Sequence, residues 1–187
     1  MAYEPWQPGM RITALRLASI SPTWQDWTPA WTTNTGANSP SLGNGTTACS
    51  YCQSGNIVFY HFEVVFGTTT SFGGGGTGDN WRFSAPVPAA TTQIICGYGE
   101  IQRGNTDAIG GSGLFSNTAG TRMGVRMRLT TASTFEVEMA SGNISGVDID
   151  AAAGLIDAST PAWGATAPDP DWTPGSYIRA FGFYRSA

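Results

Sequence analysis

The sequence predicts an all-β protein, an antiparallel β-sandwich that resembles a jelly roll. Glycine supplies 25 of the 187 residues, and charged residues make up only 12%, about half the usual share. Short segments that alternate apolar and polar residues recur at intervals of roughly ten residues with turn-forming residues between them, a pattern typical of sandwiches and barrels. Seven Trp, nine Phe and six Tyr supply apolar surface for a core. We therefore expect one β-sandwich domain over residues 24–187.

Residues 1–23 differ from the rest and predict a short N-terminal arm, extended or partly helical. Pro5, Pro8 and Pro22 interrupt this segment, and residues 12–19 form at most about two helical turns, which are unstable alone in water. Such a segment becomes ordered only against another surface, so we expect it to dock the protein. The candidate docking residues are its apolar side chains, Trp6, Met10, Ile12, Leu15 and Leu17.

The clearest strand runs from Ile57 to Phe66. Its even-numbered positions are all apolar, while the odd set carries His61 and Glu63. Because successive side chains of a strand point to opposite faces, this alternation buries the even face. Weaker alternation predicts strands over residues 48–53, 80–84, 93–102 and 176–185.

Residues 122–129 and 134–139 predict an antiparallel hairpin around a loop at residues 131–133. Both segments place apolar residues at odd numbers, and residues that face each other must share a face of the sheet. This register pairs Leu129 with Phe135 and Met127 with Val137. It also sets arginines opposite glutamates on the other face, with Arg128 opposite Glu136 and Arg126 opposite Glu138.

Charge and hydropathy exclude several classes of partner. The net charge is −4 and no basic patch is present, so we expect no nucleic acid partner. No apolar stretch approaches the ~20 residues of a membrane-spanning helix, so we expect no membrane insertion. Residues 1–11 lack the pattern of a signal peptide.

Few residues point to catalysis. His61 is the only histidine, it shares a strand face with Glu63, and no G-x-S-x-G motif accompanies it. We expect a solvated or interface-facing polar position and no enzyme activity. The run 73–76 lacks a following Lys-Ser/Thr and is interpreted as a hairpin loop rather than a phosphate site.

The cysteines and acidic pairs give weak metal signals. Cys49, Cys52 and Cys96 are an odd number, which argues against a disulfide framework, and zinc would need His61 as its fourth ligand. We expect the thiols to be small apolar fillers, and we expect no cofactor. Two acidic pairs can bind calcium or start turns, and these are Asp148/Asp150 and Asp169/Asp171.

Tryptophans are the most informative binding candidates, because exposed Trp side chains serve as platforms for sugar rings and protein contacts. Most of them are expected in the core and at interfaces, with one or two left for a ligand. The candidates for ligand or subunit contact are Trp24, Trp27, Trp163 and Trp172.

Residues 27–88 contain a T-P-x-W opening, then P-x-L-G-N-G-T, Y-x-x-x-G before a strand, a G-x-T-T-x-F-G loop and W-x-F-S-x-P. These motifs in this order resemble a module that is common in phages of actinobacteria. Residues 161–184 resemble the family's ending, and residues 5–17 are similar to N-terminal attachment segments of phage tail proteins. The matching positions are Thr28, Pro29, Trp31, Pro40, 42–46, Tyr51, Gly55, Gly67, Thr69, Thr70, Phe72, Gly73, Trp81, Phe83 and Pro86.

The resemblance implies a phage virion structural protein that forms homotrimers and has no catalytic residues. We expect a minor tail, tail-tip or fibre component on the virion surface, attached to other virion proteins through its arm and contacting host cell-wall glycan. Such a protein would be assembled in the host cytoplasm and released by lysis. The alternatives are a capsid decoration or head-fibre protein and, from a different class, an enzyme that degrades cell-wall glycan.

Overall fold

A computed structural model describes residues 9–11, 13–14, 22–36, 39–73, 80–102, 122–139 and 174–187, and all structural statements concern these residues. Every named element among them is a strand, so the predicted all-β class is confirmed. The ten strands are β1 (Gln25–Asp26), β2 (Trp31–Thr33), β3 (Thr46–Thr47), β4 (Ser50–Ser54), β5 (Ile57–Val65), β6 (Trp81–Ser84), β7 (Ile94–Gln102), β8 (Arg122–Thr131), β9 (Thr134–Met139) and β10 (Tyr177–Arg185).

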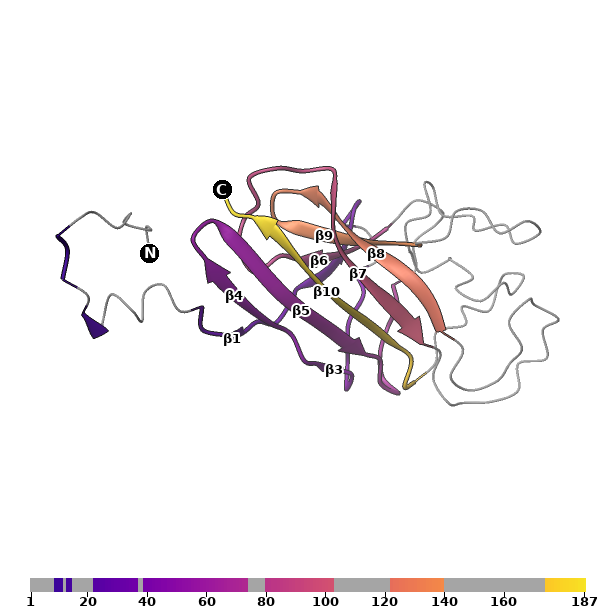
Figure 1. Ribbon diagram of the computed structural model, residues 1–187. Coiled ribbons are helices and arrows are strands. Elements are labelled where there is room, and N and C mark those ends of the chain that lie inside the picture. Colours follow the sequence, from indigo (N-terminus) through magenta and orange to yellow (C-terminus); the bar gives the residue numbers. More distant parts are fainter. Residues whose placement is uncertain are drawn as a thin grey trace.

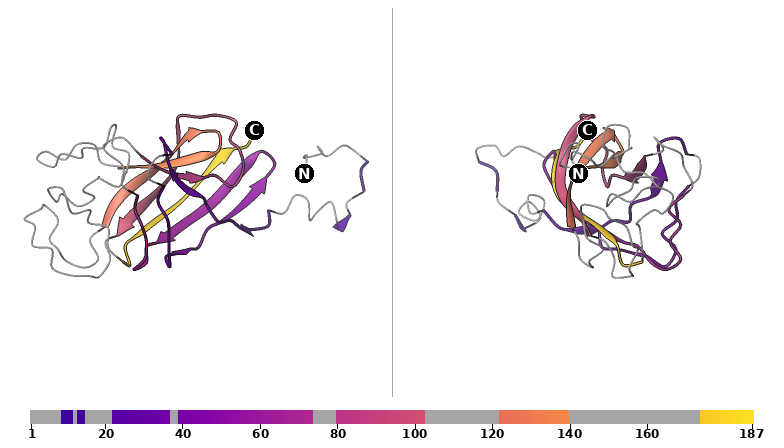
Figure 2. Two further views of the ribbon diagram at one scale, coloured as in Figure 1. Left: turned by 180° about the vertical axis from the view of Figure 1, so that it is seen from behind. Right: turned by 90° about the vertical axis from the view of Figure 1, so that its right-hand side faces the viewer.

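All ten strands belong to one hydrogen-bonded antiparallel sheet. Its order is β1-β4-β5-β10-β7-β8-β9-β6-β2, and β3 pairs with β5 beside this path. The long strands β5, β10 and β7 run side by side through the middle of the sheet (Figure 1). The sheet curls around an interior, so its two ends approach each other like the halves of a sandwich (Figure 2).

Alternation along β5 separates an inner face from an outer face. Val58, Tyr60, Phe62 and Val64 are buried inside the curl, as the even-face prediction requires. The same division holds on β10, where the even-numbered residues point inward and the odd-numbered residues from Arg179 to Arg185 are exposed. We use the term outer face for the side of the sheet that carries these exposed residues.

Aromatic rings fill the interior. Trp31 lies at the centre of one cluster, with its ring centroid 4.9 Å from that of Trp81 and 5.8 Å from that of Phe83. Tyr60 stacks on Phe135 at 4.8 Å, which joins β5 to β9 across the curl. Because β5 and β9 are distant in the sheet order, the contact between Tyr60 and Phe135 helps to hold the curl closed.

The hairpin of β8 and β9 has the predicted register. Leu129 pairs with Phe135, Met127 with Val137, and Arg128 with Glu136. The turn is tighter than expected: Ala132 and Ser133 form it, and the register shifts between Leu129 and Thr131. The shift leaves Thr130 as an extra residue, a β-bulge of the kind that bends a strand.

One predicted cross-strand ion pair of this hairpin is confirmed and the other is not: Arg126 faces and binds Glu138, whereas Arg128 faces Glu136 but binds Glu138. Arg128 binds Glu138 at 2.8 Å, and Arg126 binds the same carboxylate at 3.0 Å. Glu136 instead accepts a 2.6 Å bond from Arg82, which faces it on the neighbouring strand β6. Alternation within the hairpin cannot reveal that a third strand, β6, competes for Glu136.

Glycines let β10 and β7 approach each other under the ring of Tyr60. The pair Gly97 and Gly182 leaves space for the Tyr60 hydroxyl, and an added Cβ at Gly97 would overlap that oxygen. An added Cβ at Gly182 would overlap the carbonyl oxygen of Cys96. Only glycine therefore fits these two positions without movement of the backbone.

Candidate functional site

Four large aromatic side chains are exposed on the outer face. The exposed fraction is 41% for Phe59, 61% for Tyr98, 70% for Phe181 and 63% for Phe183. They lie on the adjacent strands β5, β7 and β10. We call these four residues the outer aromatic patch. Exposed apolar side chains that gather on one face often mark interaction sites, so the patch is the leading candidate for a functional surface.

The sheet register brings these rings together. On β10, Phe181 pairs with both His61 and Tyr98, and Phe183 pairs with Phe59. Directly paired residues on one face have neighbouring Cβ atoms, and the ring centroids of Phe59 and Phe183 are 6.1 Å apart. The patch is therefore a product of strand pairing between segments that are far apart in the sequence.

A charged row crosses the same three strands beside the patch. Arg179 of β10 pairs with Glu63 on one side and Glu100 on the other. Its Nε donates to Glu63 Oε2 at 2.6 Å, and its guanidinium carbon lies 3.9 Å from the ring centroid of Tyr177. The single proton of the Tyr177 hydroxyl is shared between two acceptors, Glu100 Oε1 at 2.9 Å and Gln102 Oε1. The hydrogen bond from Arg179 to Glu63 raises the pKa of the Arg179 guanidinium, which stays charged.

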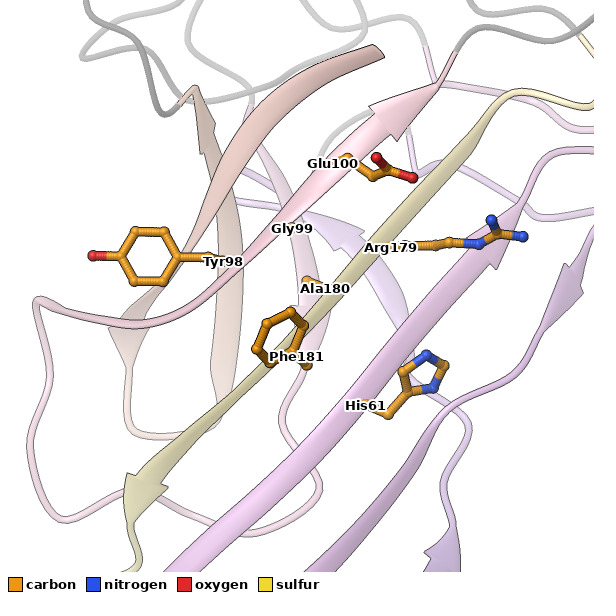
Figure 3. Close-up of a pocket in the computed structure, with 7 residues that line it drawn as sticks. All are labelled: His61, Tyr98, Gly99, Glu100, Arg179, Ala180 and Phe181. Atoms are coloured by element: carbon orange, nitrogen blue, oxygen red, sulfur yellow. The ribbon is translucent and has the colours of Figure 1, made fainter. Parts of the chain in front are cut away.

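His61, Phe181 and Tyr98 form a second cross-strand row, which we call the aromatic row. A pocket of about 400 Å³ lies between this aromatic row and the charged row (Figure 3). Its sides include Phe181 and His61 on one row and Glu100 and Arg179 on the other, and the backbone of Gly99 and Ala180 also lines it. Gly99 has no side chain, and Ala180 is buried on the inner face. The outer face is therefore hollowed between the two rows. This pocket can hold a small ligand with both apolar and hydrogen-bonding surfaces.

Three residue types of a hydrolase triad occur in one cross-strand row. Asp26 pairs with Ser50, and Ser50 pairs with His61. Nucleophilic catalysis places the imidazole between the hydroxyl and the carboxylate, whereas here Ser50 occupies the middle position. Among the described residues no hydrogen bond joins these three side chains. The row therefore lacks the geometry of a triad.

The cysteines are buried and unpaired. Burial raises the pKa of Cys49 to about 11 and that of Cys96 to about 11, and it also raises the pKa of Cys52. Cys49 and Cys96 belong to the core, so their interpretation as apolar fillers is confirmed. Within the described segments no group of three or more His, Cys, Asp or Glu side chains is arranged to hold a metal ion. Asp148, Asp150, Asp169 and Asp171 lie outside the described residues.

The tryptophan candidates separate into different environments. Trp24 is 55% exposed beside β1, whereas Trp27 packs against the core with its ring 6.0 Å from that of Phe135. Trp27 thus contributes to the fold, and Trp24 remains available for contact. Met10 is half-buried. The other proposed contact and docking residues lie outside the described residues, and they are Trp6, Ile12, Leu15, Leu17, Trp163 and Trp172.

His61 is exposed, as the sequence predicts, but the other residues of the pocket and the patch were not singled out from the sequence. The sequence does contain a signal for them, because β10 has aromatic residues on both faces. Tyr184 lies on the inner face with the buried Ile178 and Ala180. Phe181 and Phe183 lie on the outer face with Arg179. A strand that buries only one face does not need aromatic residues on both faces. The partners contributed by β5 and β7 depend on the sheet order, which alternation does not reveal.

The part of the chain that the structure describes contains no helix long and apolar enough to cross a membrane. Comparison with protein-family models, with curated proteins and with solved structures gives no match.

Proposed function

We propose that this chain is a non-enzymatic structural protein on the surface of a bacteriophage particle and that it binds through the outer aromatic patch. The observation that carries the binding role is the exposure of Phe181 and Phe183 beside Tyr98 and Phe59 on three adjacent strands. Aromatic side chains are enriched where proteins bind other molecules, and exposing them has no benefit for folding.

The virion assignment rests on the resemblance of residues 27–88 to the actinobacteriophage module. Two motifs of that module, around Leu42–Thr46 and Gly67–Phe72, contact each other in the structure. Thr70 Oγ1 donates to the carbonyl oxygen of Leu42 at 2.7 Å, and Asn44 bonds to Thr69. These motif residues thus serve the fold, which leaves the outer face free to vary in what it binds.

In this proposal residues 1–23 dock the chain to other virion proteins, three copies form the mature unit, and the curled sheet projects outward toward the host envelope. A tail-tip or fibre location is favoured over a head location because the aromatic patch and its pocket fit a recognition role. A head-fibre protein would be present in many copies per head and would contact the capsid. The described residues carry no feature specific to that role.

Immunogold labelling of intact particles with antibodies against the chain tests the proposal. We expect label at the tail tip or fibres. Label over the head would favour the capsid decoration alternative. Absence of label from both the head and the tail would overturn the virion assignment. Release of reducing ends from host wall polymer by the purified protein would overturn the non-enzymatic part.

A further inference from the structure

The pocket on the outer face has two chemically different sides. The aromatic row presents Tyr98, Phe181 and His61, and the charged row presents Glu100, Arg179 and Glu63. The two rows are two residues apart along each strand, a spacing of about 7 Å. Figure 3 shows Phe181 and His61 on one side of the hollow and Glu100 and Arg179 on the other.

The aromatic side is open to a ligand. Phe181 is 70% exposed, and no ring of the described residues packs against it. His61 is exposed and has no hydrogen-bond or ion-pair partner among the described residues. A ligand with an apolar face would therefore cover Phe181 without displacing any internal contact.

The charged side is held in place before a ligand arrives. Glu63 bonds to Arg179 through both carboxylate oxygens, at 2.6 and 3.4 Å, and the guanidinium stacks on Tyr177. Tyr177 in turn donates to Glu100. Fixed donors and acceptors reduce the entropy lost on binding. Carboxylates accept strong hydrogen bonds from hydroxyl groups, and a guanidinium donates to their oxygens.

The charges restrict the class of ligand. Two carboxylates and one guanidinium give the row an excess of negative charge, which disfavours phosphates, carboxylates and nucleic acid. A pyranose ring has an apolar C–H face and a rim of hydroxyl groups, which match Phe181 and the charged row respectively. The volume of about 400 Å³ lies within the range of small-ligand sites.

We infer that this pocket binds a neutral pyranose unit of a glycan, with the sugar ring on Phe181 and its hydroxyl groups bonded to Glu100, Arg179 and His61. The inference rests on the proposed recognition function and specifies its ligand. It assigns Phe181, which lines the pocket, as the main contact.

The test is an NMR titration of the full chain with the methyl glycosides of glucose, galactose, mannose and N-acetylglucosamine. We expect binding of at least one of these glycosides to saturate, with a dissociation constant of about 1 mM. The Phe181→Ala and Glu100→Gln variants should each weaken it by about tenfold or more. The control is Arg185→Ala, which alters an exposed residue of the same strand outside the pocket and the outer aromatic patch and should bind as the wild type does. Methyl glucuronide should bind more weakly than methyl glucoside.

Several results would overturn the inference. These are an absence of saturation with every neutral glycoside, equal binding by the Phe181→Ala variant, and tighter binding of the glucuronide. A drop in oligomer mass for Phe181→Ala in light scattering would show instead that the face contacts a second copy. Thermal unfolding of each variant checks its fold. Label on intact particles without sugar binding would reject this inference alone, whereas sugar binding by a chain absent from particles would reject the virion assignment alone.

Discussion

Asn44 and Thr69 bind each other through three hydrogen bonds that lock two loops together. The side-chain oxygen of Asn44 accepts from the backbone N–H of Thr69 at 2.9 Å and from its hydroxyl at 3.0 Å. The backbone N–H of Asn44 donates to Thr69 Oγ1 at 2.9 Å. The asparagine of this Asn-Gly-Thr sequence therefore acts as a structural clasp between the segment before β3 and the segment after β5.

Replacing Asn44 by Ala should lower the free energy of unfolding by about 1–2 kcal/mol, because the loops lose the two bonds that the side-chain oxygen accepts from Thr69 and the bond from its Nδ2 to Thr68. Urea unfolding measures the change. The control is Asn56→Ala, which alters an exposed asparagine in the turn between β4 and β5 and should change stability by less than about 0.5 kcal/mol. Equal effects of the two substitutions would show that Asn44 is not a clasp.

The ion pairs of β6, β8 and β9 should show coupling that follows the observed contacts. A double-mutant cycle on Arg82 and Glu136 should give an interaction of about 1 kcal/mol, since Glu136 is buried and Arg82 is half-buried. The cycle on Arg128 and Glu136, which face each other but do not bond, should give a smaller value. Larger coupling in the second cycle would mean that Arg128, rather than Arg82, neutralises Glu136 in solution.

Gly97→Ala should destabilise the protein by about 1–3 kcal/mol, because the new methyl group overlaps the Tyr60 hydroxyl and presses on the backbone of β10. Tyr60→Phe removes that hydroxyl. Combining the two substitutions should therefore cost less than the sum of the single changes, with the remainder due to contact with the carbonyl oxygen of Phe181. Strict additivity in thermal unfolding would place the obstruction elsewhere.

Stability should fall as pH rises above 9. Burial raises the pKa of Cys49 and Cys96 from 9.0 to about 11, so between these values the unfolded chain loses thiol protons that the folded chain retains. The stabilisation is therefore complete below pH 9 and lost as the pH rises through 11, by up to about 3 kcal/mol per thiol. Burial raises the pKa of Tyr184 to about 12, which extends the decline.

Urea unfolding at pH 8 and pH 10.5 measures this decline. Cys96→Ala should show a smaller difference between the two pH values than the wild type does, because it lacks one of the titrating thiols. Equal stability of the wild type at both pH values would contradict the burial of Cys49 and Cys96.

Local alternation predicted the strands and the hairpin because period-two patterns in β5, β8 and β9 report directly which face is buried. The pairing of Leu129 with Phe135 followed from the same pattern and a short loop. The candidate site depended on the placement of β10 between β5 and β7, which joins Phe181 to His61 and Tyr98. Such non-local pairing leaves no local trace, so the pocket could not be predicted. The short strands β1, β2 and β3 were also missed, because two or three residues show no periodicity.

The most direct test of the outer aromatic patch as the binding surface is to measure binding of the purified full chain to a panel of actinobacterial cell walls. We predict that the wild type binds at least one of them. The triple variant Phe59→Thr, Phe181→Thr and Phe183→Thr should lose at least about tenfold in affinity while its melting temperature changes little, because these side chains are exposed and threonine is suited to strands. The control Trp24→Thr removes an exposed ring elsewhere and should bind like the wild type. Undiminished binding by the triple variant, or loss of binding in the Trp24 control alone, would contradict the account.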